Sequence, residues 1–488
     1  MSFVDWVVVG LYAFGMLVIG WYYARKTKSS EDYHLGGRGM APWMVGLSLF
    51  ASLLSTISYL AVPGEIIKYG PMVLAQIIVF PFIGLVVGWL LIPRIMKLKI
   101  TSAYEILEVR LGLSIRLLGS AIFILLRLMW MGLVTYATCD KVLVPILHLD
   151  SSATPWLCAI LAGITLVYTS MGGLKAVVLT DVIQTFILFG GAVIALVLIT
   201  VKLGGVSQWV PTQWSPTWQK PVLFDFESRM SFAGIMISTF CWYVFTCGSD
   251  QVAVQRYLAT RDAKAARKAF FTTLSAGAIV NIFLGMLGFA LFAYFSKYGN
   301  ANGAVDADKL FPHFIANELP VGVSGLVIAG LLAAAMSSLS SGINSSCSVI
   351  STDFVERFFK KTHSNKSRIR LDRIISVAIG LVVVSLGIFA DLVPGNLIGM
   401  TFRVSNLLVA PLFVLFFLAM FVKFSNPIGA WSSAVSSITT AVLIAFWEPI
   451  TGQPGISFLW IMPASFAVGA SVGITFSYLF RASCLIHK

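Results

Sequence analysis

Charged residues are scarce in this chain: only 11% of its 488 residues are Asp, Glu, Lys or Arg, whereas soluble domains average about 25%. No polar stretch is long enough to fold as a soluble domain between the apolar runs. Hydrophobic residues make up 58% of the sequence, and the mean hydropathy is +0.89. These values predict an all-α polytopic membrane protein. They do not fit a membrane β-barrel, which would show short segments of alternating hydrophobicity.

Cysteine is also scarce, and its pattern excludes two classes of small site. The six cysteines include no CxxC pair and lie in or beside apolar runs, so neither a disulfide framework nor a zinc site is indicated. No histidine and carboxylate cluster lies within an apolar run, which argues against an enzyme. The net charge of +13 does not indicate a nucleic-acid partner, because the basic residues alternate with membrane spans.

The apolar runs predict about thirteen membrane spans. The first covers residues 4–24 and is expected to be retained, because it carries Asp5 and lacks the basic start of a signal peptide. The others centre near Phe50, Ile83, Ile124, Ala162, Phe189, Ile237, Leu284, Leu332, Leu381, Leu412, Ala441 and Ala467. Most of the 34 lysines and arginines then fall on one side. The positive-inside rule therefore predicts a cell (plasma) membrane protein with the N-terminus outside and the C-terminus in the cytoplasm.

Two of the connecting segments are expected to have structure of their own. Residues 97–116 alternate basic and apolar side chains, which predicts an amphipathic helix lying at the inner interface. Residues 204–229 form an outer loop with three tryptophans, Trp209, Trp214 and Trp218. Tryptophan is enriched at the membrane interface, so we expect these rings at the level of the lipid headgroups.

Two spans are interrupted by polar residues. The second span reads Phe50 to Gly64 with several hydroxyls and a closing Pro-Gly, and the seventh reads Trp242 to Asp250 with Cys-Gly-Ser-Asp at its end. They are five spans apart, so they would open two successive five-helix units. Broken helices in matching positions of two halves are typical of an inverted-repeat transporter with its site at mid-membrane.

The segment Ala333–Ser346 is the most informative part of the sequence. It places six serines and Asn344 within a run that is otherwise apolar enough to cross a membrane. Ala334, Ser337, Ser338, Ser341 and Ser345 share one helical face. Lipid offers no partner to a hydroxyl, so this face must meet protein, water or an ion. A stripe of hard oxygen donors suits a small cation such as sodium, whereas a stripe of small residues also suits close helix packing.

A few other polar residues lie inside apolar runs. Arg127 and Arg403 would each cost on the order of 3 kcal/mol to insert, so each needs a partner or a water-filled cavity. Arg127 could contact an anionic solute or act as a structural hydrogen-bond centre. Asp181 lies near the predicted inner side, where it could release a cation, relay protons or cap a helix. Gln76, alone among aliphatic residues, must also find a partner.

Five stretches together resemble the sodium/solute symporter family, whose members include sodium–glucose, sialate, proline, iodide, vitamin and monocarboxylate symporters. They are Asp32-Tyr-His-Leu-Gly-Gly-Arg38, Ile100-Thr-Ser-Ala-Tyr-Glu-Ile-Leu-Glu108, Thr169-Ser-Met-Gly-Gly-Leu-Lys175 with Thr180-Asp-Val-Ile-Gln184, Gly248-Ser-Asp-Gln-Val-Ala-Val-Gln-Arg-Tyr257, and the serine-rich segment. The resemblance implies a leucine-transporter architecture. Its parts would be an extra first helix and inner loop (1–41), two inverted five-helix repeats (42–202 and 231–421) joined by an outer loop (203–230), and two extra helices with a short inner tail (422–488).

The same resemblance implies the ion sites. The sodium site common to the family corresponds to the backbone carbonyls of Ala51, Leu54 and Ala334 with the hydroxyls of Ser337 and Ser338. Some members hold a second sodium at the equivalents of Asp181, Ser340 and Ser341. All three residues are present here, so one sodium ion is expected and a second is permitted.

Substrate residues follow from the resemblance, together with Arg127 from its place in a span. The solute cavity would be lined by Leu53, Ser55, Ser58, Gln76, Arg127, Trp130, Tyr243, Phe245 and Thr246. The sialate branch carries an arginine where this chain has Trp130, which disfavours sialate. The run Arg127-Leu-Met-Trp-Met-Gly132 is more similar to the iodide, vitamin and monocarboxylate branch, which points toward a small anion.

The expected function is therefore sodium-coupled import of a small polar or anionic solute by alternating access. A sugar or other neutral solute fits the hydroxyls and Gln76 as well, and proton coupling could use the same scaffold. A channel would need a continuous pore, and a sensor would normally carry a signalling domain. The lipid bilayer and a small solute are the only partners that the sequence implies.

Overall fold

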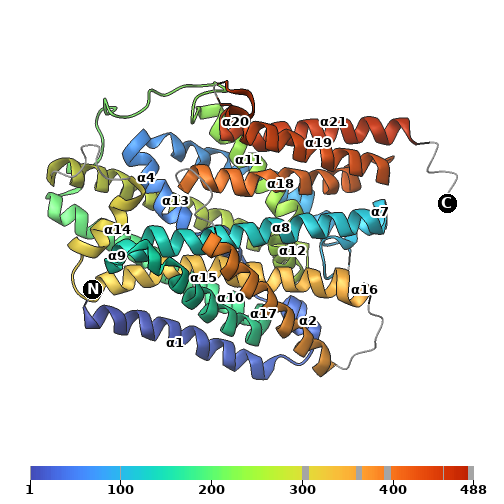
Figure 1. Ribbon diagram of the computed structural model, residues 1–488, viewed down its shortest axis with the longest axis horizontal. Helices are drawn as coiled ribbons and strands as arrows, with labels where there is room; N and C mark the ends of the chain where they lie inside the picture. Colours follow the sequence, from blue (N-terminus) through green and yellow to red (C-terminus); the bar gives the residue numbers. More distant parts are fainter. Residues whose placement is uncertain are drawn as a thin grey trace.

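The fold is a bundle of long helices, seen side-on in the computed structural model of Figure 1. The structure describes residues 2–98, 100–298, 307–358, 365–389, 397–453 and 455–481, without the side chains of 308, 366, 389 and 397–405. No strand occurs among these residues. Arg403 and Cys484 thus lie outside the described side chains, so the expected partner of Arg403 is not seen.

Most of the longer helices run along the bundle between its two ends, whereas α14 lies at one end (Figure 1). They are α1 (Phe3–Lys26), α3 (Pro42–Leu53), α4 (Thr56–Tyr69), α8 (Leu113–Thr138), α10 (Thr154–Leu203), α11 (Phe232–Ser249), α13 (Ala263–Tyr298), α14 (Ala307–Glu318), α15 (Val323–Val349), α17 (Asn365–Phe389), α18 (Leu397–Phe421), α19 (Pro427–Ala445) and α21 (Ile461–Leu479).

Shorter elements connect or extend these helices. They are α2 (Ser30–Leu35), η1 (Gly36–Arg38), η2 (Pro71–Val79), α5 (Phe80–Leu85), η3 (Val86–Leu91), α6 (Ile92–Ile95), α7 (Glu105–Leu111), η4 (Cys139–Leu143), α9 (Val144–Leu147), η5 (Ser151–Ala153), η6 (Val206–Gln208), α12 (Gln251–Leu258), η7 (Ile350–Val355), α16 (Glu356–Phe358), α20 (Trp447–Thr451) and η9 (Phe458–Trp460).

The described residues contain ten helices long and apolar enough to cross a membrane, or eleven spans if the bent pair α3–α4 is included. The thirteen expected spans stay a prediction, as does the division into two five-helix repeats. Thirteen would require α10 to count twice and the shorter apolar stretch Asn406–Phe421 to count once. The length of α10 favours that reading, because 50 residues of straight helix would measure about 75 Å, more than twice the hydrocarbon core.

A glycine divides α10 into two helices. Gly173 has φ 61° and ψ −163°, a conformation that is essentially restricted to glycine. A Cβ atom at this position would lie 2.7 Å from the carbonyl oxygen of Tyr33. The segment α2, which contains Tyr33, therefore packs closely into the kink.

The two predicted interruptions occur, the first at a different place from the Pro-Gly pair and the second within the stretch that the sequence indicated. Helices α3 and α4 meet at an angle of 63°, and the break lies at Leu54 and Ser55, while Pro63 is inside α4. Helix α11 ends at Ser249, and Asp250 has an extended conformation before α12 begins. Local capping rather than proline sets both breaks, because Ser55 and Asp250 accept hydrogen bonds from the first turns of α4 and α12.

One expectation about the connecting segments is wrong. Residues 97–116 do not form one interfacial helix, because Gly112 has φ 89° and separates the short α7 from α8. Trp209 and Trp218 are buried, and the level of the tryptophans relative to the lipid headgroups stays a prediction. The Trp218 ring packs against Gly70 and the rings of Phe289 and Phe292, so the long loop covers the end of α4.

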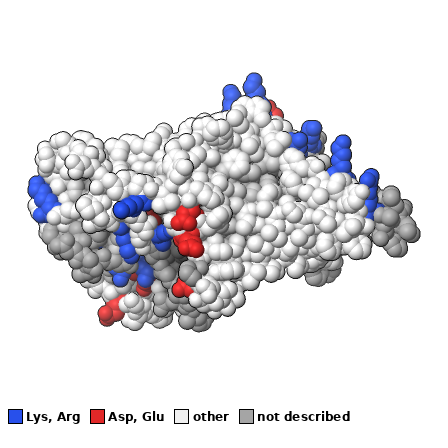
Figure 2. Space-filling model, turned by 90° about the horizontal axis from the view of Figure 1, so that it is seen from above, with Lys and Arg blue, Asp and Glu red and all other residues white. Residues whose placement is uncertain are grey.

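The surface fits a membrane environment. Figure 2 shows Lys, Arg, Asp and Glu gathered in groups, with a broad uncharged area between them. Large exposed side chains outside those groups are apolar, among them Leu11, Phe82, Ile160 and Val435. Helix α1 shares this exposed character, yet its Asp5 is buried and accepts hydrogen bonds from the backbone N–H groups of Gly322 and Gly325 at the start of α15.

Replacing Gly173 by Ala should destabilise the protein. The new Cβ would have to adopt the glycine-restricted conformation against Tyr33, at a cost of about 1–3 kcal/mol. We expect a lower thermal unfolding midpoint for purified full-length G173A. The matched control is G163A in the same element, where a Cβ meets nothing within 4 Å. Equal midpoints for the two variants would contradict the kinked geometry of α10.

Candidate ion and solute sites

The serine stripe of α15 faces the broken end of α3. The hydroxyl of Ser337 donates to the carbonyl oxygens of Ala51 (2.8 Å) and Ala334 (3.0 Å), and the hydroxyl of Ser338 donates to the carbonyl oxygen of Leu54 (3.4 Å). All residues from 333 to 349 are buried. The structure therefore brings together the five residues that the resemblance implied for the common sodium site, at the contact of two helices far apart in sequence.

The carbonyl groups are available because α3 stops there. Leu54 is extended (φ −89°, ψ 123°) and caps the helix through its N–H group, which donates to the Phe50 carbonyl. The last carbonyls of a helix have no partner within it, and they carry the negative end of the helix dipole. The carbonyls of Ala51 and Leu54, which have no backbone partner within α3, thus form a weakly negative surface that suits a cation.

Neutral oxygens make up this whole group. Carbonyl and hydroxyl oxygens are hard ligands, which suit a hard cation better than a transition metal. No cluster of three His, Cys, Asp or Glu that could hold another metal ion occurs among the described residues. The group can therefore coordinate sodium without a carboxylate, so a bound ion adds its full charge to the site.

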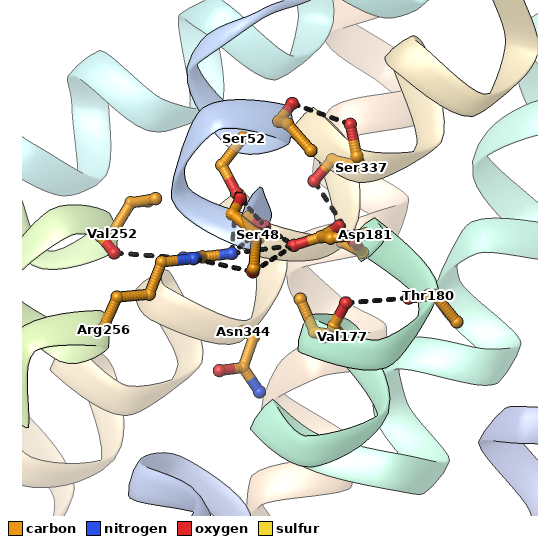
Figure 3. A network of polar contacts seen from close by, with 12 residues as sticks. Ser48, Ser52, Val177, Thr180, Asp181, Val252, Arg256, Ser337 and Asn344 are labelled. Atoms are coloured by element: carbon orange, nitrogen blue, oxygen red, sulfur yellow. Dashed lines mark hydrogen bonds and ion pairs between the residues drawn. The ribbon is translucent and has the colours of Figure 1, made fainter. Parts of the chain in front are cut away.

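Asp181 has a different neighbour from the one expected. The guanidinium of Arg256 reaches from α12 to the Asp181 carboxylate (Nη2–Oδ2 3.0 Å), and both side chains are fully buried (Figure 3). Arg256 also donates to the hydroxyls of Ser48, Ser52 and Ser341, at 2.9, 2.6 and 2.6 Å. The guanidinium of Arg256 thus lies beside Asp181, where the family resemblance permitted a second sodium ion.

Two details bear on that second site. Ser341 lies 3.4 Å from Asp181 Oδ2, whereas the hydroxyl of Ser340 donates to the Ser337 carbonyl on its own helix. Asp181 Oδ1 is buried without a hydrogen-bond partner among the described residues. A second cation would therefore have to bind Oδ1 next to a guanidinium, whose positive charge weakens its affinity.

A central cavity of about 190 Å³ lies beside the α3–α4 break. Of the predicted solute residues, seven line it: Leu53, Ser58, Gln76, Arg127, Trp130, Tyr243 and Thr246. The sequence did not single out several further lining residues, among them Trp242, Asn281 and Asn406. Aromatic walls with a few polar groups are typical of the lining of a small-molecule site.

Two predicted solute residues do not line the cavity. The Ser55 hydroxyl accepts from the Ser58 N–H group and caps α4. The ring of Phe245 stacks on Phe413 with centroids 4.7 Å apart and also packs against Phe466. Successive helical residues differ by about 100° in direction, so Phe245 points away from the cavity that Thr246 lines.

The polar lining is rich in groups without a partner. Gln76 Nε2 donates to Asn281 Oδ1 at 3.2 Å. In contrast, Arg127 Nε, Asn406 Nδ2 and the Thr246 hydroxyl are buried and have no hydrogen-bond partner among the described residues. Most of these atoms are donors. Buried donors are nearly always satisfied, so the cavity is suited to a solute that presents acceptor oxygens.

Arg127 also pairs with a carboxylate. Its guanidinium binds Asp250 through Nη2, and both side chains are buried. The ion pair fits the structural role left open by the sequence, and solute contact by Arg127 stays a prediction. Asp250 and Arg256 lie in the Gly248–Tyr257 stretch and were missed as site residues. Their i, i+6 spacing places them at the two ends of one short helix, α12, and gives no local signal of partners on α8 and α10.

Comparison with known proteins assigns the chain. The family model of the sodium:solute symporter family matches residues 33–436. The chain belongs to this family. It is a sodium-coupled symporter of the family, and the relatives are transporters rather than enzymes.

The match covers most of the length of each relative. The chain is 31% identical to the sodium/sialic acid symporter SiaT of Proteus mirabilis over 91% of this chain and 89% of that protein. It is 30% identical to the mouse sodium-coupled monocarboxylate transporter 1, over 93% and 74% of the two chains. The identities do not separate the sialate branch from the monocarboxylate and vitamin branch, so the solute is not decided by them.

Solved structures agree on the fold. A substrate-bound, outward-open sodium-coupled sialic acid symporter, described as having a novel sodium site, superposes with a TM-score of 0.83 at 28% identity, covering 98% of both chains. Mhp1, a nucleobase-cation-symport-1 family transporter, superposes with a TM-score of 0.60 at 12% identity over 93% of this chain. That second likeness concerns the fold alone.

Loss of one partner from the Asp181–Arg256 pair should be costly. D181N would leave a buried guanidinium without a counter-charge, which costs about 3–5 kcal/mol. We expect D181N and R256Q each to unfold at lower temperature, and the double variant to be more stable than the sum of the two losses predicts. Thermal unfolding of the four purified proteins measures this. Strictly additive losses would show that the two charges do not stabilise each other.

Proposed function

We propose that this protein imports a small polar or anionic solute together with sodium by alternating access. Residues 42–202 and 231–421 act as two inverted repeats, and the N-terminus lies outside. The observation that carries the proposal is the contact of Ser337 and Ser338 with the carbonyls of Ala51 and Leu54. A sodium ion held there binds α3 and α15 at once, so its binding favours one arrangement of the two helices.

Coupling follows from this shared site. If sodium stabilises the conformation that accepts the solute, the solute raises the affinity for sodium by the same factor. The cavity and the ion site are adjacent, since Leu54 and Ser52 both line the cavity. The solute and the ion can therefore act on the same break between α3 and α4 without touching each other.

The free energy supplied by one sodium ion limits how strongly a solute can be accumulated. A tenfold sodium gradient supplies about 1.4 kcal/mol, and a potential of 100 mV adds about 2.3 kcal/mol per charge. One sodium would thus support roughly 500-fold accumulation of a neutral solute. One sodium ion and one monoanion together carry no net charge, so only the sodium concentration gradient drives their uptake. An anionic solute therefore favours a second sodium more strongly than a neutral one does.

Ion pairs close both ends of the bundle. At the end where α7 and α16 lie (right in Figure 1), Arg116 binds the buried Asp353 with Nη2–Oδ1 at 2.6 Å. At the opposite end, Arg229 binds the buried Glu65 through Nε (2.9 Å) and Nη2 (2.8 Å). Such pairs join segments far apart in the sequence and can open and re-form, as an alternating gate requires.

The solute class is inferred from the cavity. Unpartnered donors favour acceptor oxygens, and the aromatic walls of Trp130, Trp242 and Tyr243 favour a compact solute with an apolar part. A carboxylate of modest size satisfies both conditions, whereas a large polyhydroxylated acid would leave hydroxyls against aromatic rings. A sugar or other neutral solute stays the second candidate, supported by the Gln76–Asn281 amide pair, which can bind hydroxyl groups.

Removing one hydroxyl should weaken sodium binding. S338A deletes a ligand oxygen, and we expect sodium affinity to fall by about tenfold, equivalent to about 1.4 kcal/mol. The measurement is the sodium-dependent rise of the unfolding midpoint, which needs no knowledge of the solute. S345A is the matched control, because its hydroxyl bonds only carbonyls of its own helix. An unchanged sodium response in S338A would remove this site assignment.

The ion stoichiometry should be one sodium per solute, in which case a monoanionic solute is accumulated by the sodium concentration gradient alone. Arg256 already neutralises Asp181, so a second sodium would add an uncompensated charge. A thermal-shift screen of carboxylates, sugars, amino acids, vitamins and halides, with and without sodium, identifies a transported solute. Reversal potentials in proteoliposomes then give the charge moved per solute. A ratio that indicates two sodium ions, and falls to one in D181N, would assign the second ion to Asp181 instead.

A further inference from the structure

The guanidinium of Arg127 has hydrogen-bond partners for only some of its nitrogen atoms. Nη2 binds Asp250, whereas Nε has no hydrogen-bond partner among the described residues. The residue lines the central cavity and is only 7% exposed. An unsatisfied buried donor costs about 1–3 kcal/mol, so its position beside an empty volume points to a ligand that completes it.

The geometry of a guanidinium decides how such a ligand binds. A planar group with two acceptor oxygens binds two neighbouring N–H donors in parallel, and the edge that contains Nε also contains Nη2. Arg229 shows this arrangement elsewhere in the protein, with Nε and Nη2 on the two oxygens of Glu65. A two-oxygen ligand that uses Arg127 Nε therefore meets the same Nη2 that Asp250 holds.

Asp250 links this edge to the hinge of the second broken helix. It lies between α11 and α12, and its Oδ1 accepts from the Val252 N–H group at 2.8 Å, which caps α12. Its other oxygen, Oδ2, binds Arg127 on α8. One carboxylate thus ties α8 to the start of α12. If Arg127 left, the carboxylate would keep its cap and the favourable end of the helix dipole.

The other end of α12 reaches the Asp181 network. The Val252 carbonyl accepts from Arg256 Nη1 at 3.0 Å, and Arg256 Nη2 binds Asp181 on α10 and Ser341 on α15. Figure 3 shows Arg256 extending from α12 between these helices. A shift at Asp250 is therefore transmitted over one helical turn to residues next to the proposed sodium site.

We propose that a two-oxygen acceptor of the solute and the Asp250 carboxylate compete for Arg127, so that solute binding releases α12 from α8. This inference rests on the proposed function and adds how the solute is sensed. Arg127 is the contact residue and Asp250 the positioning residue. A ligand with a single acceptor atom can use Nε alone and leaves the Arg127–Asp250 pair intact. The device therefore distinguishes carboxylate-like solutes from halides and simple alcohols.

The test uses Cys247, a buried cysteine less than one turn before Asp250. D250N keeps a side-chain oxygen for the cap but removes the charge that holds Arg127. We expect N-ethylmaleimide to modify Cys247 in D250N at least about fivefold faster than in the wild type, the lower end of ordinary coupling energies. Mass spectrometry of the full-length protein, without solute, measures each cysteine separately.

Controls distinguish release of α12 from general loosening. Cys158 and Cys347, buried in α10 and α15, should be modified at the wild-type rate in D250N. E318Q removes the carboxylate that pairs with Lys202 between α14 and α10 and should leave Cys247 protected. R127K keeps a positive charge for Asp250 but loses the forked edge, so it should resemble the wild type when no solute is present. Unchanged Cys247 modification in D250N, or equal acceleration at all three cysteines, would overturn the inference.

A second arm adds solute probes. Pyruvate and N-acetylneuraminate with sodium should accelerate Cys247 modification in the wild type if transported, and R127K should remove that response. Bromide should have no effect. Sodium-dependent uptake by the wild type with unchanged D250N labelling leaves the proposed function standing and rejects the competition. Faster labelling of Cys247 alone in D250N, without any sodium-dependent uptake by the wild type, supports the competition and rejects the proposed function.

Discussion

The end of α3 at Leu53 is the constraint on which the site depends. Because the helix stops inside the bundle, the carbonyls of Ala51 and Leu54 need partners that lipid and apolar side chains cannot supply. Helix α15 provides them with Ser337 and Ser338, and Thr56 at the start of α4 donates back to the Leu331 carbonyl of α15. The break and the serine stripe thus require each other, and α15 must be buried along its length to make these bonds.

Charges inside the bundle are arranged as neutral pairs between helices. Arg127 with Asp250, Arg256 with Asp181 and Arg116 with Asp353 each join two different elements. In a medium of low dielectric constant, a pair of this kind holds its helices firmly but is costly to split. The proposed sodium site has only neutral oxygens, so its charge comes with the ion. The membrane potential then acts chiefly on the cargo, while the pairs set which helices move together.

The sequence predicted the parts of the site that lie on one helix face. Helical periodicity placed Ser337 and Ser338 on one face of a helix, and the family resemblance selected them, with Ala51 and Leu54, for the ion site. Partners distant in sequence were not predictable: Arg256 is 75 residues from Asp181, and nothing near it marks it as anything but an inner-side basic residue. Phe245 and Trp218 show the same limit, since the direction of an aromatic ring depends on neighbours such as Phe413 and Phe289. The division of α10 was predicted, because spans centred near Ala162 and Phe189 were separated, but the sequence did not single out Gly173 as the residue at the kink.

Helix α12 shows why two ion pairs can act as one mechanism. It has only eight residues, all buried, and so short a helix has little stability of its own. Its start is held by the Asp250 cap and the bond to Arg127, and its end by Arg256 among Asp181, Ser52 and Ser341. Because α12 is held at both ends by ion pairs, a movement at one end also displaces the other. Any event that weakens the pair at the cavity must therefore strain the pair beside the serine stripe, which gives the solute a mechanical route to the ion site.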